Sequence, residues 1–308
     1  MKQSATYKPE IEGIRGGACL IVLLGHSVAG IFPAIYFGNA YQAHSGIENI
    51  IHETPLNLLF NGSAMVMIFF IISGYFIGRR VKHKNLIDFV VRRYIRYVPM
   101  VTVGILLGAI VMWFGMVNSI RLAEYSYAGE YVRLYNNFEP TVFGRDGIVL
   151  DALFKVFLVG SDYNSVLWYI SISFLGEIIF TAILNLLQNK KMQLTIMCVV
   201  IVSLWIVGVK FWQLQYLSGM AVGILIAILD IKIDGLKAGI IFAVGVVLLS
   251  FEDKSPAGIY LPLQQISEWI IPIWSIGGAI GLLGGMSNRI LFKVFSSRRL
   301  VWFGKYSF

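Results

Sequence analysis

The sequence predicts an all-α fold, a polytopic transmembrane helical bundle, and two observations carry this prediction. Hydrophobic residues fill 57% of the 308 positions and charged residues only 14%, whereas a soluble domain carries about 25% charged residues. Several apolar stretches also run for roughly 20 residues, the length that a helix needs to cross a bilayer. These stretches are continuous, while the strands of a membrane barrel would alternate in polarity. We therefore expect a single integral membrane domain over residues 1–308.

The apolar stretches define about eight complete spans. We place them at residues 15–37, 56–78, 98–118, 166–187, 194–209, 214–229, 238–251 and 266–285. A last apolar segment begins near Leu300, and we expect it to be the start of a truncated final span, so that the C-terminal span is missing. The first span carries charged residues and lacks a small-residue cleavage site, so it is expected to stay in the mature protein.

Two segments between the spans are predicted to be helical. Asn85 is a suitable N-cap for a helix in the basic loop, and Pro99 then fits the first turn of the third span. The apolar segment 148–160 is too short to span easily and is interrupted by Asp151 and Lys155. This pattern favours an amphipathic helix on the outer surface of the membrane.

The distribution of basic residues predicts the orientation. With a cytoplasmic N-terminus, the inside segments hold 19 of the 25 Lys and Arg residues and the outside segments hold six, as the positive-inside rule requires. The net charge of +8 is thus mainly a topology signal, and no nucleic-acid partner is needed to explain it. Cys19 and Cys198 both lie in apolar spans, so neither a disulfide framework nor a metal site is expected.

The first span contains two ionisable residues, Arg15 and His26. They are eleven residues apart, which puts them on nearly the same helix face, about 16 Å apart along the axis. Ionisable groups inside a membrane helix are costly and mark functional sites by default. His26 is either a hydrogen-bonded residue of the bundle or a general base. Arg15 is either an anchor paired with Glu12 or a donor to an anion or an oxyanion.

The loop that follows the second span is the most basic stretch, with seven Lys and Arg residues between positions 79 and 96. One interpretation is contact with anionic lipid headgroups combined with the topology signal. The other is a site for a phosphorylated cytoplasmic ligand, because arginine forks match phosphate oxygens.

Three ordered blocks resemble the membrane acyltransferase-3 family, which includes polysaccharide and lipopolysaccharide O-acetyltransferases. The blocks are Glu-Gly-Ile-Arg-Gly at 12–16 with ten residues between Arg15 and His26, Phe-Phe-Ile-Ile-Ser-Gly-Tyr at 69–75, and a basic helix ending in Arg93, Arg96 and Pro99. A late helix rich in small residues and the C-terminal Phe-Gly-Lys-Tyr-Ser-Phe also fit. The resemblance therefore covers nearly the whole chain.

The resemblance implies an enzyme of the bacterial inner membrane that takes an acyl group, usually acetyl, from cytoplasmic acetyl-CoA. The acceptor would be a hydroxyl of a cell-envelope glycan or lipid-linked saccharide. His26 and Arg15 would be the essential pair, with His26 acting as a general base or carrying the acyl group transiently. We expect the donor to be held by Ser73 of the second block and by the basic residues Arg79, Arg92, Arg93 and Arg96.

The fourth candidate block departs from the family pattern. Ser173 stands where many members carry a glutamate, and Glu177 lies one turn further on the same helix face. Glu177 is therefore a third catalytic candidate, which would orient the histidine or hold the acceptor hydroxyl. Alternatively, it is a mid-membrane carboxyl paired with another polar group or kept neutral.

A rival function is also compatible with these residues. In a transporter or flippase of lipid-linked sugars, His26, Arg15 and Glu177 would form a polar pathway. Such transporters often carry paired repeats or helices broken at matching positions in two halves, and the sequence shows neither clearly. The acyltransferase interpretation is therefore the one that we carry forward, with acyl-CoA, a saccharide acceptor and membrane lipids as partners.

Overall fold

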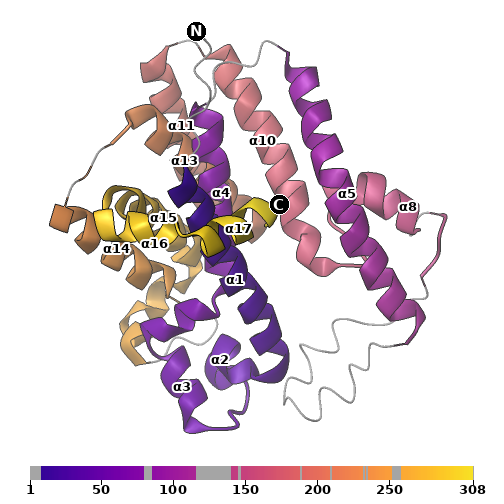
Figure 1. The fold of residues 1–308 in the computed structure, drawn as a ribbon, viewed down its shortest axis with the longest axis horizontal. Coiled ribbons are helices and arrows are strands. Elements are labelled where there is room, and N and C mark those ends of the chain that lie inside the picture. The colour runs from indigo at the N-terminus through magenta and orange to yellow at the C-terminus, as the bar shows by residue number, and fades with distance from the viewer. Residues whose placement is uncertain are drawn as a thin grey trace. The chain divides into compact units, whose positions relative to one another are not determined.

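The computed structural model describes residues 8–79, 85–115, 140–144, 147–187, 189–208, 210–231, 233, 235–251 and 258–307. In these ranges the regular structure is helical (Figure 1). Seven of the described helical stretches, one of them Trp212–Leu229, are long and apolar enough to cross a membrane, and α14 (Gly235–Leu249) is an eighth, shorter apolar helix. The predicted polytopic helical bundle is thereby confirmed.

The chain divides into two compact units. Unit one comprises residues 1–81 and 187–307, and unit two comprises residues 82–186. The α-helices of unit one are α1 (Pro9–Ile31), α2 (Pro33–Phe37), α3 (Gly46–His52), α4 (Gly62–Arg79), α11 (Lys190–Gly208), α12 (Trp212–Gln215), α13 (Leu217–Leu229), α14, α15 (Ile270–Ser287), α16 (Arg289–Phe295) and α17 (Arg298–Tyr306). Its 3-10 segments are η1 (Gly38–Ala40), η2 (Pro55–Leu59) and η5 (Gly258–Trp269).

The helices of unit one pack through small residues that let their backbones approach closely. Helix α4 packs against α13, where a Cβ built on Gly223 would lie 2.0 Å from the carbonyl oxygen of Ile71. Helix α17, drawn in yellow, crosses the indigo α1 (Figure 1). A Cβ on Gly16 of α1 would lie 2.1 Å from the carbonyl oxygen of Leu300. The C-terminal segment is thus a helix packed on the first span, and whether it starts a further span stays a prediction.

Two adjacent glycines of α1 provide a matched test of this packing. Gly16→Ala is expected to destabilise unit one by about 1–3 kcal/mol, because the new methyl group would overlap the α17 backbone. The control is Gly17→Ala, since a Cβ at Gly17 would meet no atom within 4 Å. That control is expected to be neutral or to stabilise the helix by up to about 1 kcal/mol. Thermal unfolding in detergent measures both effects, and equal behaviour of the two variants would contradict the packing.

Unit two is built on two long helices and a short helical segment between them. Its elements are α5 (Leu86–Trp113), α8 (Ile148–Leu150), the π-helical turn η3 (Asp151–Lys155), α9 (Val156–Leu158), the 3-10 turn η4 (Ser165–Leu167) and α10 (Trp168–Leu186). Its core joins α5, the short segment and α10, and it includes Ile105, Val156, Phe157 and Phe174.

The predicted boundary at Pro99 is wrong, because α5 is one continuous helix through this proline. Asn85 is the N-cap, as predicted, and its Oδ1 accepts hydrogen bonds from the backbone N–H groups of Ile87 and Asp88. A proline inside a helix removes one backbone hydrogen bond. Tyr97 and Val101, on either side of the proline, are both buried in the same core, so the packing of α5 continues across the proline.

The first span begins and ends six residues earlier than predicted, and the second span is shorter than predicted. Helix α1 ends at Ile31, Phe32 leaves the helical conformation, and α2 restarts at Pro33. The reason is local, since a residue that precedes proline is pushed out of the α region. The second span begins at Gly62, because the apolar residues before it form the separate 3-10 segment η2.

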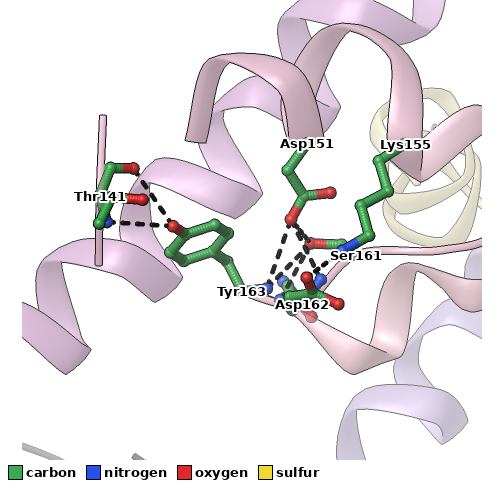
Figure 2. Close-up of polar contacts among 7 residues, drawn as sticks. Thr141, Asp151, Lys155, Ser161, Asp162 and Tyr163 are labelled. Atoms are coloured by element: carbon green, nitrogen blue, oxygen red, sulfur yellow. Dashed lines mark hydrogen bonds and ion pairs between the residues drawn. The ribbon is translucent and has the colours of Figure 1, made fainter. Parts of the chain in front are cut away.

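The segment 148–160 contains a short helix, as predicted, but the first of its two charged residues, Asp151, is buried. Asp151 is 1% exposed, whereas Phe154 is 57% exposed. The Asp151 carboxylate points to the turn at 161–163 (Figure 2), where its Oδ2 accepts hydrogen bonds from the Ser161 hydroxyl at 2.8 Å and the Asp162 backbone N–H at 3.1 Å. Asp151 therefore fixes this turn, and sequence periodicity could not place it there.

The stability of this turn is expected to depend on pH. Burial raises the pKa of Asp151 above its ordinary value, although the hydrogen bonds from Ser161 and the backbone act in the opposite direction. A raised pKa means that protonation favours the folded state. The contribution of Asp151 to the free energy of unfolding is thus fully present below the ordinary aspartate pKa of about 4, and it is lost as the pH rises through the raised pKa. Melting temperatures between pH 4 and pH 7 should therefore fall more in the wild type than in Asp151→Asn, and parallel curves would contradict this.

Candidate functional site

Helix α1 carries the predicted pair, Arg15 and His26, on one uninterrupted helix. Arg15 Nη1 contacts Glu12 Oε2 at 3.1 Å, and its side chain is only 12% exposed. The guanidinium carbon lies 5.8 Å from the centre of the Phe76 ring on α4. Because Glu12 is one turn nearer the N-terminus, these contacts direct the Arg15 guanidinium away from His26.

His26 lies on the exposed side of α1. Its neighbour Gly25 is buried against the chain segment that leads into α4, where an added Cβ would lie 2.3 Å from the carbonyl oxygen of Phe60. This close approach fixes the part of α1 that carries the imidazole. The sequence prediction that His26 and Arg15 share a helix face is consistent with the unbroken helix, which keeps them three turns apart.

A pocket of about 450 Å³ lies where four helix ends of unit one meet. Lys8 stands at the start of α1, Arg79 at the end of α4, Asp230 directly after α13, and Ser287 at the end of α15. The orientation predicted from Lys and Arg places all four of these chain segments on the cytoplasmic side. The structure independently brings them together around one pocket.

Two cations and one carboxylate line this pocket, arranged around the Tyr75 ring. The Arg79 guanidinium forms an ion pair with Asp230, and its Nε donates a hydrogen bond to the Tyr75 hydroxyl at 3.2 Å. Lys8 Nζ lies 5.4 Å and the Arg79 guanidinium carbon 5.5 Å from the centre of the same ring. Ser73, the predicted donor-binding residue two positions earlier, is buried in α4 and is not among the lining residues.

Unit two contains a buried ion pair between α5 and α10. Arg93 Nε lies 2.8 Å from Glu177 Oε2, with the two side chains 12% and 2% exposed. The Tyr97 hydroxyl makes a long contact of 3.5 Å to Glu177 Oε1 and is also hydrogen-bonded to Ser173. Ser173 and Glu177 thus face α5 together, as their spacing predicts. The guanidinium carbon of Arg93 further lies 5.6 Å from the centre of the Phe89 ring.

The predicted site residues are distributed over both units. His26, Arg15, Ser73 and Arg79 belong to unit one, whereas Glu177, Arg92, Arg93 and Arg96 belong to unit two. Within the basic block, Arg93 points to Glu177, Arg96 is exposed, and Arg92 is exposed and paired with Asp88 on its own helix. The three arginines of this block therefore do not converge on one point of unit two.

Of the residues that line the pocket, only Arg79 was predicted from the sequence as a site residue, and the charged or aromatic groups arranged with it, Lys8, Tyr75 and Asp230, were not. Tyr75 lies in the second motif block, which was a usable signal. Asp230 is 151 residues from its partner Arg79, and no local pattern indicates such a pairing.

Comparison with protein families gives one finding. A family model described as an acyltransferase domain, acyltransferase-3, matches residues 8–308. Neither the curated proteins nor the solved structures provide a match to the chain.

Proposed function

Because the chain belongs to the acyltransferase-3 family, we propose that it transfers an acetyl group from acyl-CoA to a hydroxyl of a cell-envelope glycan or lipid-linked saccharide. The coarser part of this statement follows from the family and the apolar helices, which make the protein a membrane acyltransferase. The donor, the acceptor and the roles of individual residues are the proposal.

The observation that carries the proposal is the order of polar groups along α1. Lys8, Arg15 and His26 recur at intervals of seven and eleven residues, which places them on nearly one face at about 10 Å and 16 Å intervals along the axis. Acyl-CoA is an extended molecule with phosphates at one end and the thioester at the other. The two cations at the pocket and, further along α1, Arg15 suit the phosphates at the anionic end of the donor. The exposed His26 suits the thioester at the other end.

The chemistry assigned to His26 is general base catalysis. The imidazole accepts the proton of the acceptor hydroxyl as that oxygen forms a bond to the thioester carbonyl carbon. The tetrahedral oxyanion then collapses, the carbon–sulfur bond breaks, and the CoA thiolate leaves with the proton returned by the imidazolium. Arg15 is assigned to donor binding rather than to the oxyanion, because its contacts with Glu12 and Phe76 hold it three turns away.

Glu177 receives no chemical step in this proposal. Its carboxylate is engaged with Arg93 inside unit two, which corresponds to the alternative of a mid-membrane carboxyl paired with another polar group. Because Arg93 is engaged with Glu177, we assign it to holding α5 and α10 together. The CoA phosphates are then assigned to Arg79.

Transfer by the purified protein tests the proposal. The protein in liposomes is supplied with acetyl-CoA labelled in the acetyl group and with lipid-linked saccharides extracted from cell envelopes. We expect release of the CoA thiol together with label in the saccharide fraction. A transporter or flippase would leave acetyl-CoA intact, and intact acetyl-CoA with this native acceptor mixture would contradict the proposal.

A further inference from the structure

The pocket at the ends of α1, α4, α13 and α15, to which the proposed function assigns the CoA phosphates, also contains a carboxylate that this assignment does not use. We propose that it binds phosphate groups through Lys8 and Arg79, and that Asp230 is a resident counter-ion that the incoming phosphate displaces from Arg79. The inference rests on the proposed function for one point only, the identity of the phosphorylated ligand as acyl-CoA or CoA.

The charges of the pocket favour an anion. Of its described lining residues, Lys8 and Arg79 are positive and Asp230 is negative, so one positive charge exceeds the resident carboxylate. The bond from Arg79 Nε to the Tyr75 hydroxyl orients the guanidinium and leaves its Nη edge directed at Asp230. A phosphate accepts the same planar edge, often through two parallel hydrogen bonds, and carries more charge than a carboxylate. Phosphate is therefore a stronger partner for this edge than Asp230.

The ion pair between Arg79 and Asp230 is one that a ligand can break. Their side chains are 39% and 54% exposed, and exposed ion pairs contribute little to stability because water screens them. The pair between Arg93 and Glu177, at 12% and 2% exposure, is the opposite case, since separating it would leave a buried charge without its partner. Of these two pairs, the one that lines the pocket is the exposed one.

The position of Asp230 at the C-terminal end of α13 does not favour a carboxylate for local stability. Asp230 has φ 49° and ψ 45°, and it is the one non-glycine residue with positive φ in the part of the chain that the structure describes. Glycine or asparagine is the usual residue at such a left-handed helix end. A carboxylate at the C-terminal end of α13 also opposes the helix dipole. Aspartate tolerates the left-handed backbone, but the helix dipole disfavours its charge at this end, while the contact with Arg79 gives the carboxylate a role.

The functional consequence is a lower affinity for phosphorylated ligands than the two cations alone would give. Each turnover leaves CoA, which keeps every phosphate of the donor, in the same site. A carboxylate that returns to Arg79 competes with the phosphates and favours release of spent CoA. Asp230 thus sets the balance between donor binding and product release.

Equilibrium binding of CoA, which cannot react, tests this inference in phosphatidylcholine nanodiscs. Asp230→Asn tolerates the left-handed backbone and removes only the charge, so we expect it to bind CoA roughly fivefold to tenfold more tightly than the wild type. Asp230→Gly, which also suits that backbone, should behave alike. Arg79→Gln should bind roughly tenfold more weakly, and adding Asp230→Asn to Arg79→Gln should restore nothing. Phosphate-free pantetheine should bind all variants equally.

The outcomes separate the inference from the proposed function. If both Asp230 variants bind CoA no more tightly than the wild type, while Arg79→Gln still binds CoA more weakly, the role of Asp230 as a displaced counter-ion is overturned. The phosphate site itself is then retained. Unchanged CoA binding by Arg79→Gln would remove the phosphate site and the proposed donor position with it. A third arm adds phosphatidylglycerol to the nanodiscs. Loss of CoA binding there by wild type and Asp230→Asn alike would assign the pocket to lipid headgroups and overturn the inference for CoA.

Discussion

Replacing His26 with alanine is expected to lower the acyl-transfer rate by about 10²–10⁴-fold, the usual contribution of a general base. The affinity for CoA should stay unchanged, because the cations assigned to the phosphates lie at the opposite end of α1. The rate is measured as thiol release from acetyl-CoA in liposomes, and the affinity as CoA binding to the same preparation.

The matched control for this variant is His44→Ala. His44 belongs to the same unit, and its imidazole contacts Glu48 at 3.5 Å ahead of α3. We expect that variant to transfer acetyl groups at the wild-type rate. Normal transfer by His26→Ala in correctly inserted protein would contradict the assigned base. Label that remains on the wild-type protein, but not on His26→Ala, after rapid denaturation at neutral pH would instead favour His26 as a transient acyl carrier.

Removing the carboxylate of Glu177 is expected to give the largest loss of stability. Glu177→Ala leaves the Arg93 guanidinium without its partner between α5 and α10, and breaking such a buried pair costs about 3–5 kcal/mol. The double variant Glu177→Leu/Arg93→Met removes both charges and should recover most of this loss, since apolar replacements of buried pairs are often neutral or stabilising. Thermal unfolding of the purified protein compares the variants.

The control is an exposed ion pair on α5, the helix that carries Arg93. Arg92 and Asp88 are 78% and 53% exposed, so Arg92→Ala is expected to change stability by at most about 0.5 kcal/mol. Equal stability of Glu177→Ala and Arg92→Ala would show that the buried pair is dispensable. Acyl transfer by Glu177→Leu/Arg93→Met tests the prediction that Glu177 is a catalytic residue. Retained activity would assign Glu177 to the packing of unit two.

Much of the fold could be predicted because the relevant signals are local. Apolar stretches of spanning length give the membrane helices, and Asn85 begins α5 because its side chain caps its own helix. Pro99 misled the prediction, since proline interrupts helices on average. The core contacts of Tyr97 and Val101 on both sides of it, which decide this case, involve residues far away in the chain.

The site could be predicted only in part, for the same reason. Helical spacing was sufficient to place Arg15 with His26 and Ser173 with Glu177, because each pair lies on one helix. The partners of these residues come from other helices. Phe76 meets Arg15 from α4, and Arg93 meets Glu177 from α5, and neither contact has a sequence pattern that announces it.

The sequence by itself determined that this protein is a helical membrane protein and which ionisable residues share a helix. These properties depend on composition and on a period of 3.6 residues. Only the tertiary structure decided that Arg79 meets Asp230 beside Lys8 and that Arg93 is held by Glu177. The first of these pairings follows from how closely Gly223 lets α13 approach α4, because that approach brings Arg79 and Asp230 within reach of each other, and the second follows from the packing of α5 against α10 in the core of unit two.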